Sequence, residues 1–177
     1  MKYFYYLAFL FVLGTSAQAQ KFESSKSYIK FYSSAPMEDI EATNETVKSI
    51  IDLDKGEMVY SVKIKDFQFE KSLMQEHFNE NYLESEKYPK STFSGIIKNW
   101  NKQEGEQEVV VAGKLSIHGI TKEVEISGKI NYSGDQVTVY AKFPVELKDY
   151  KVKIPKALFY NIAESVEVTV DFEYKKL

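Results

Sequence analysis

The stretch Val166-Glu167-Val168-Thr169-Val170-Asp171-Phe172-Glu173-Tyr174 decides the fold class. Every second side chain in it is apolar, and the side chains between them are polar or charged. Successive side chains of a β-strand point to opposite faces, so this period of two indicates a strand with one face in a core and the other in water. Strands of parallel sheets are covered on both faces and form continuous apolar runs instead. The stretch therefore predicts an antiparallel sheet.

The same alternation extends outward through the chain. Three further runs lie in the C-terminal half, of which the first ends at the turn signal His118-Gly119 and the second at Ser133-Gly134-Asp135, and five less regular candidates lie in the N-terminal half. Together these segments predict about nine strands: Lys26–Ser33, Glu38–Asn44, Val47–Asp52, Met58–Lys65, Thr92–Trp100, Val109–Ile117, Val124–Ile130, Val137–Leu147 and Val166–Tyr174.

A meander with this many strands and one apolar face must cover that face by closing on itself or by forming a sandwich. The strands after Glu57 are long, which favours a tilted barrel. Two segments break the strand pattern. Ser72–Leu83 is expected to form a short helix, and Lys148–Glu164, which contains Pro155, is expected to form a long connection that caps a barrel mouth.

Composition narrows the function classes. The chain has 177 residues, with 23 lysines, no arginine, no cysteine and 26 acidic residues, for a formal net charge of -3. These numbers suggest one domain and exclude disulfides and cysteine-ligated metal. They leave no cationic surface typical of a nucleic-acid-binding protein. A charged fraction of 28% is too high for a protein with several membrane spans, and a hydrophobic fraction of 44% is too high for disorder.

The first 19 residues have the features of a secretory signal peptide. Lys2 precedes an apolar stretch from Tyr3 to Leu13, and Ala17-Gln18-Ala19 offers small residues for cleavage. An apolar stretch of about eleven residues is shorter than the roughly twenty that a spanning helix needs. We therefore expect cleavage near Ala19, a mature domain of residues 20–177 without a permanent membrane anchor, and a periplasmic or secreted location.

Few residues offer chemistry. His118 precedes a glycine in a predicted turn, where a structural role with a backbone hydrogen bond is expected. His77 lies among glutamates and is the one imidazole there, so a solvated helix face is expected rather than a metal site. Glu84 and Glu86 lie in a polar segment without the apolar surroundings of a general acid. No nucleophile motif or phosphate-binding glycine loop is found. The sequence thus predicts no catalytic residue, no metal and no cofactor.

Two motifs resemble landmarks of the YceI-like family. Tyr88-Pro89-Lys90-Ser91-Thr92-Phe93 is similar to its YPxxxF strand start, and Gly113–Lys122, with the sequence GKLSIHGITK, is similar to its GxLTIHGVTK hairpin. Met74–Tyr82 resembles the helical segment before the first motif. The resemblance covers roughly Ile64 to Tyr174. It implies a lipocalin-like antiparallel barrel of about eight strands, exported to the periplasm, whose interior holds a long apolar isoprenoid chain.

A barrel of this size is either filled by its own side chains or holds one slim ligand. Six apolar residues are candidates for the lining of such a pocket: Phe67, Phe69, Phe93, Ile117, Ile126 and Phe143. Ordinary core packing of these residues remains an alternative. Two other functional classes also stay open, namely a ligand-free barrel that acts as an envelope interaction or stress-response protein, and a small enzyme acting on a bound lipid. The sequence favours a non-enzymatic carrier of a polyisoprenoid or quinone and leaves the oligomeric state open, a homodimer included.

Overall fold

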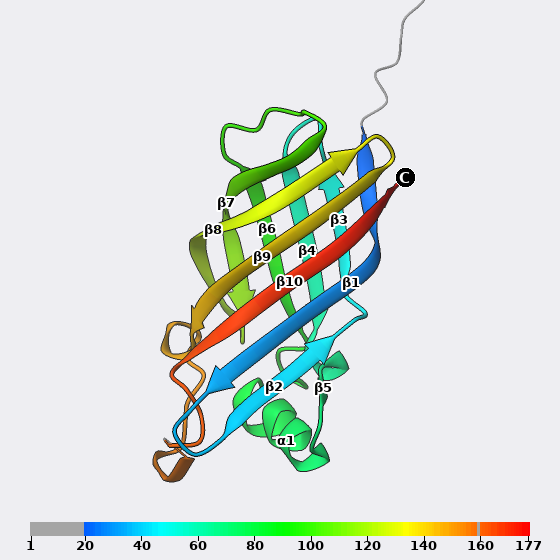
Figure 1. Ribbon diagram of the computed structural model, residues 1–177. Coiled ribbons are helices and arrows are strands. Elements are labelled where there is room, and N and C mark those ends of the chain that lie inside the picture. The colour runs from blue at the N-terminus through cyan, green and yellow to red at the C-terminus, as the bar shows by residue number, and fades with distance from the viewer. Residues whose placement is uncertain (1–19, 159) are drawn as a thin grey trace, which may run out of the picture.

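The computed structural model describes residues 20–158 and 160–177, and the predicted signal peptide lies outside this part of the chain. None of the described helices has the length and apolar character needed to span a membrane. Ten strands form one antiparallel sheet (Figure 1): β1 (Lys21–Ser34), β2 (Asp39–Asn44), β3 (Lys48–Asp52), β4 (Glu57–Lys63), β5 (Gln68–Phe69), β6 (Lys90–Ile97), β7 (Gly105–Ile117), β8 (Ile120–Ser133), β9 (Gln136–Glu146) and β10 (Ser165–Lys176).

Eight of these strands close into a barrel, because β10 pairs with β1 over most of its length. The order around the barrel is β1-β3-β4-β6-β7-β8-β9-β10. Strand β1 changes partner along its length: Lys21–Glu23 pair with β3, whereas Ile29–Ser34 pair with β2, which in turn pairs with β5. The predicted all-β antiparallel barrel is confirmed. Strand β5 was not predicted, because a strand of two residues is too short to show a period of two.

Helical segments gather at the end of the barrel that lies at the bottom of Figure 1. The predicted helix is present as α1 (Ser72–His77), which continues into a π-helical turn, η2 (Phe78–Tyr82). A 3₁₀ turn, η1 (Ile64–Asp66), precedes β5. The predicted long connection after β9 carries η3 (Leu147–Tyr150) and η4 (Lys156–Leu158) across this end. We call it the helical end.

The hairpin between β7 and β8 follows from two residues. His118 and Gly119 have φ angles of 50° and 74°, which is the left-handed pair that a two-residue type I′ turn requires. A Cβ atom at position 119 would lie 2.5 Å from the Tyr88 ring, so glycine is needed there for space as well. The Tyr-Pro motif before β6 and the His-Gly turn are therefore packed against each other.

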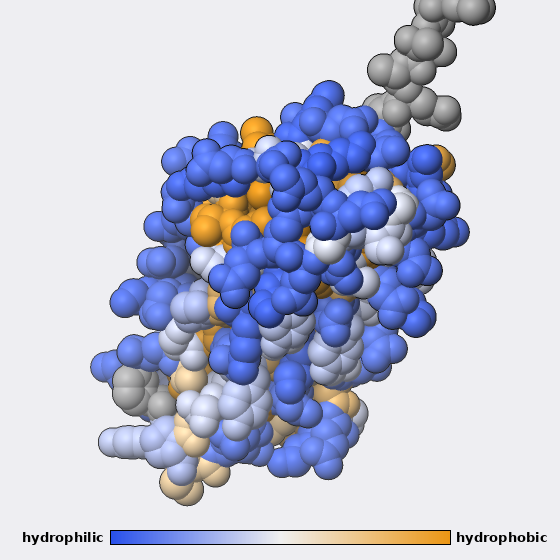
Figure 2. Space-filling view, turned by 45° about the horizontal axis from the view of Figure 1, so that its top comes forward, coloured by the Kyte–Doolittle hydropathy of each residue, from blue (hydrophilic) through white to orange (hydrophobic). Residues whose placement is uncertain are grey.

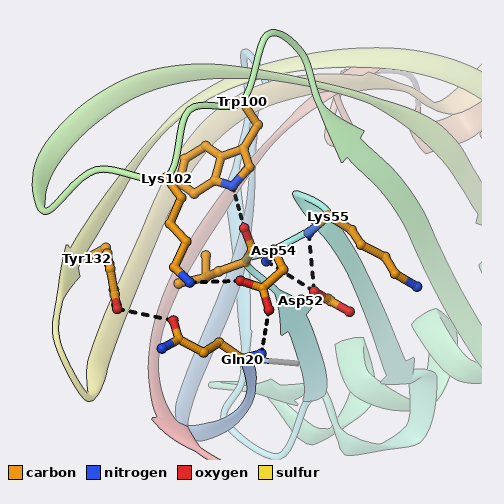
Figure 3. Close-up of polar contacts among 8 residues, drawn as sticks. Gln20, Asp52, Asp54, Lys55, Trp100, Lys102 and Tyr132 are labelled. Carbon is orange, nitrogen blue, oxygen red and sulfur yellow. Dashed lines mark hydrogen bonds and ion pairs between the residues drawn. The ribbon is translucent and has the colours of Figure 1, made fainter. Parts of the chain in front are cut away.

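The opposite end of the barrel is sealed by a well-packed core. Phe22, Ile51, Leu53, Val137 and Phe172 have no exposed surface there. Polar contacts close this sealed end on the outside, as Figure 3 shows. The Trp100 indole donates to the carbonyl oxygen of Leu53 at 2.6 Å. Asp54 accepts from the Gln20 backbone and from Lys102, at 2.8 Å each. The Tyr132 hydroxyl donates to the Gln20 side chain at 3.3 Å.

Candidate functional site: a cavity in the barrel

A cavity of about 350 Å³ occupies the barrel between the sealed end and the helical end. Its innermost lining residues include Met58, Tyr60 and Val139, which lie below the sealed core. From there it extends to α1 and to the connection after β9, where His77 and Asn161 line it. Since His77 is exposed, the cavity reaches solvent at the helical end.

The lining is apolar almost throughout, because the inward-facing side of each barrel strand carries aliphatic and aromatic residues. Among the described lining residues, only Glu38 and Lys129 carry a formal charge. Glu38 is held in an ion pair with Lys71 at 2.8 Å. An interior of this kind offers little to a sugar or a nucleotide and favours a hydrocarbon chain.

All six residues expected to line a pocket do line this cavity: Phe67, Phe69, Phe93, Ile117, Ile126 and Phe143. They come from five segments around the barrel, namely the β5 region, β6, β7, β8 and β9. Phe67 and Phe93 are buried, and the other four are half-buried. The structure thus brings the candidates together around one space, while their contact with a ligand stays a prediction.

Four phenylalanines form an aromatic cluster where β1, the β5 region and η2 meet. Phe31 stacks on Phe78 with ring centroids 5.4 Å apart, and Phe67 and Phe69 pack against both rings at 5.0 to 5.6 Å. All four line the cavity. Sequence reasoning did not select Phe31 and Phe78. The alternation Ile29-Phe31-Ser33 in β1 is the signal that assigns Phe31 to the inner face.

Three hydroxyl groups lie beside the inner end of the cavity. Tyr174 hydrogen-bonds both to Ser49 Oγ at 2.7 Å and to the Tyr60 hydroxyl at 3.1 Å, and Ser49 donates to the Val59 carbonyl oxygen at 2.9 Å. Burial raises the pKa of Tyr60 and raises that of Tyr174 well above the ordinary tyrosine value. Both phenols therefore stay neutral, and the partners of this network lie within the protein.

His118 joins three segments at the helical end. Its Nε2 lies 2.6 Å from a carboxylate oxygen of Glu84, and its Nδ1 lies 3.2 Å from the carbonyl oxygen of Tyr150 in η3. The Tyr88 ring contacts the imidazole edge to face, with centroids 4.6 Å apart. The two carboxylates expected in a polar segment have different partners: Glu84, whose side chain is 43% exposed, bonds His118, whereas Glu86, whose side chain is 88% exposed, pairs with Lys65.

Most of the face shown in Figure 2 is hydrophilic, with its largest apolar area at the upper left and smaller apolar areas elsewhere, including at the lower end. Within residues 20–158 and 160–177, no group of three or more histidine, aspartate or glutamate side chains is arranged to hold a metal ion. The glycosylation-like sequence at Asn44 is not an accessible site, because Asn44 is 1% exposed and its amide donates to the Lys63 carbonyl oxygen.

Solved structures show the same fold. A polyisoprenoid-binding domain from Saccharophagus degradans, implicated in plant cell wall breakdown, superposes with a TM-score of 0.76 at 15% identity, covering 90% of this chain and 99% of that one. BcnA from Burkholderia cenocepacia gives 0.71 at 17% identity, covering 83% and 95%. The YceI protein of Campylobacter jejuni gives 0.57 at 16% identity, covering 72% and 77%.

A search of curated proteins finds no match. The model of the YceI-like domain, however, matches residues 20–174, which is most of the chain. The two motifs that suggested this resemblance lie in the structure where the family pattern requires them, at the start of β6 and in the hairpin between β7 and β8. The chain belongs to the YceI-like family.

Proposed function

We propose that the chain is an exported, non-enzymatic binding protein that holds a long apolar lipid of the polyisoprenoid or quinone type in its barrel cavity. The observation that carries this proposal is the cavity itself, with about 350 Å³ of space and an apolar lining. Ligand pockets in proteins typically measure about 300 to 1,000 Å³. A barrel built only for stability would fill this space with side chains, as the sealed end does.

Hydrocarbon burial supplies enough free energy for useful affinity. Each buried methylene group contributes about 0.8 kcal/mol, so ten such groups contribute roughly 8 kcal/mol before the costs of association are subtracted. No charged partner is needed, which suits a lining with two charged residues at its margins. The fold relation to a polyisoprenoid-binding domain supports a chain-like ligand.

The histidines give no ground for proposing catalysis in the cavity, because His77 lines it only at its exposed mouth and His118 lies outside the lining. His118 and Glu84 are bonded to each other, and neither lines the cavity. The tyrosine hydroxyls beside its inner end are neutral and bonded within the protein. Export rests on the signal-peptide features of residues 1–19.

The test is a fluorescence titration with diphenylhexatriene, a slim hydrocarbon that emits in apolar surroundings, with geranylgeraniol as the competitor. Phe143→Asp places a carboxylate in the cavity wall at a half-buried position, so it should abolish binding while the barrel still folds. Thr138→Asp is the matched control, since it adds the same charge on the exposed face of the same strand. Equal binding by the two variants, or no binding by the unmodified protein, would favour the ligand-free interaction protein.

A further inference from the structure

Strands β8 and β9 are paired along only part of their length. Their register runs from Ser133 opposite Gln136 to Gly128 opposite Ala141 and ends there. Beyond this point β8 continues to Ile120 paired with β7, and β9 continues to Glu146 paired with β10. Within the described residues no strand pairs with the facing edges. We call the interval between Ile120–Ser127 and Lys142–Glu146 the side slot (strands labelled in Figure 1).

Two residues mark the place where the strands separate. A Cβ atom at Gly128 would lie 2.6 Å from the carbonyl oxygen of Tyr140, so only glycine allows the last close approach of β8 to β9. Pro144 lies in the part of β9 that borders the slot. Proline has no N–H group to donate and occurs in sheets mainly on edge strands, so its position fits a free edge. The sequence is thus compatible with a free edge on β9 beside the slot.

The ion pairs near the slot connect each of its strands to that strand's other neighbour. Lys129 of β8 pairs with Glu106 of β7 at 2.8 Å, and Lys142 of β9 pairs with Glu167 of β10 at 2.8 Å. Among the ion pairs of the described residues, none connects β8 to β9. Lys129 lies in the paired part of β8 and Lys142 at the start of the unpaired part of β9, and neither ion pair bridges the slot.

The cavity reaches the outer surface at the upper corner of the slot. Ile126 and Phe143 face inward beside the slot and line the cavity. Lys129 and Tyr140 lie opposite each other on the outer face, yet they line the same cavity. Tyr140 is 44% exposed. Lys129 and Tyr140 are the pair next to the last paired residues, so the lining of the cavity extends to the corner where β8 and β9 separate and includes exposed residues there.

The lower border of the slot is closed by η3. Tyr150 is buried in a cluster against which Ile117 and Ile120 of the β7–β8 hairpin pack. Its carbonyl oxygen is the partner of His118 Nδ1 at 3.2 Å. His118 therefore ties the segment that follows β9 to the hairpin that begins β8, and it acts as a positioning residue for the slot.

We propose that the apolar chain of the ligand enters and leaves the cavity sideways, through the side slot, while its polar end stays outside near Lys129 and Tyr140. This inference rests on the proposed function and adds the route and the ligand shape. Burying a polar group without a partner is costly. If the ligand entered end-on from the helical end, its polar end would have to pass along the apolar cavity to reach Lys129 and Tyr140. A sideways path lets the polar end remain in water throughout. The ligand class is a slim hydrocarbon chain with one polar end.

The experiment cross-links the slot and follows exchange of diphenylhexatriene by stopped-flow fluorescence. Ser127→Cys with Lys142→Cys places thiols one step beyond the last paired residues, on exposed positions of a chain that has no other cysteine. A cleavable bismaleimide that contains a disulfide joins them. The matched control is Asn131→Cys with Thr138→Cys, which are partners in the paired part of the same two strands.

Side entry predicts that cross-linking the slot pair slows association and dissociation alike, by tenfold or more, with the Kd unchanged. Cleaving the linker should restore both rates in the same sample, and cross-linking the control pair should leave them unchanged. Unaltered rates in the cross-linked slot variant would overturn side entry and assign exchange to the helical end. Failure of every variant, and of the unmodified protein, to bind the probe would instead overturn the proposed function.

Discussion

Replacing Ala141 with leucine separates a ligand cavity from an ordinary core. Ala141 is buried on the inner face of β9 and lines the cavity. Leucine adds three carbon atoms, which set an upper limit of about 2.4 kcal/mol for the gain from their burial. We expect Ala141→Leu to stabilise the empty protein by about 1 to 2 kcal/mol, because the side chain enters space that is already present. For a domain of this size that corresponds to a melting temperature about 2 to 8 °C higher.

The same substitution should weaken ligand binding, because the leucine takes up space that the hydrocarbon needs. A loss of about 1 to 2 kcal/mol is roughly a 5- to 30-fold rise in Kd. The assays are urea unfolding of lipid-free protein, followed by the fluorescence of Trp100, which is the one tryptophan in the chain, and titration with diphenylhexatriene.

Val137→Leu is the matched control at the sealed end of the same strand. Val137 has no exposed surface, so one more carbon atom there should overpack the core and cost about 1 to 3 kcal/mol. Ala141→Leu and Val137→Leu should therefore change stability in opposite directions. If Ala141→Leu destabilises the protein as well and leaves Kd unchanged, the space beside Ala141 is not a ligand site.

Three further outcomes follow from the contacts. Because burial raises the pKa of Tyr60 and Tyr174, the native state retains protons that the unfolded chain loses above pH 10, so stability should fall by about 1.4 kcal/mol per pH unit for each tyrosine, measured by urea unfolding at pH 9 to 11. His118→Asn, which suits a positive φ, should cost about 1 to 3 kcal/mol and speed diphenylhexatriene exchange in stopped-flow measurements. If the chain is cleaved before Gln20, the backbone N–H that donates to Asp54 becomes a charged ammonium group. Asp54→Asn should therefore lower the melting temperature more in a protein that starts at Gln20 than in the 177-residue chain, and this difference should shrink at high salt.

The strands of the C-terminal half were predictable from sequence because each has one buried and one wet face. Val109–Ile117 and Val166–Tyr174 both lie within strands of the barrel, and the His118-Gly119 pair forms the turn expected of it. Alternation also places Ile117, Ile126 and Phe143 on the inner face, where they border the cavity, whereas Phe67 and Phe69 lie outside the predicted strands.

Alternation does not distinguish a filled interior from a hollow one. Phe172 of β10 and Phe143 of β9 both continue the apolar alternation of their strands, yet Phe172 has no exposed surface in the sealed core, whereas Phe143 borders the cavity. The difference depends on how far each strand extends beyond its last paired residue and on which side chains face each other across the barrel. Both are properties of the closed structure.

The side slot was missed for a related reason. The runs of β8 and β9 alternate without a break, so nothing in their periodicity marks the end of pairing at Gly128 and Ala141. Pro144 was the available signal, because a proline inside an otherwise regular strand indicates an edge. The hydrogen bond between His118 and Glu84 could not be predicted either, because 34 residues separate them in the chain.

The most direct test of the central claim is native mass spectrometry of the protein purified from its own host, followed by organic extraction and identification of what is released. A lipid held in the cavity predicts a protein species with added mass, an extracted lipid with a long hydrocarbon chain, and the loss of both in Phe143→Asp but not in Thr138→Asp. Repeated preparations that contain only the unliganded mass, together with a crystal structure in which side chains fill the barrel, would contradict it.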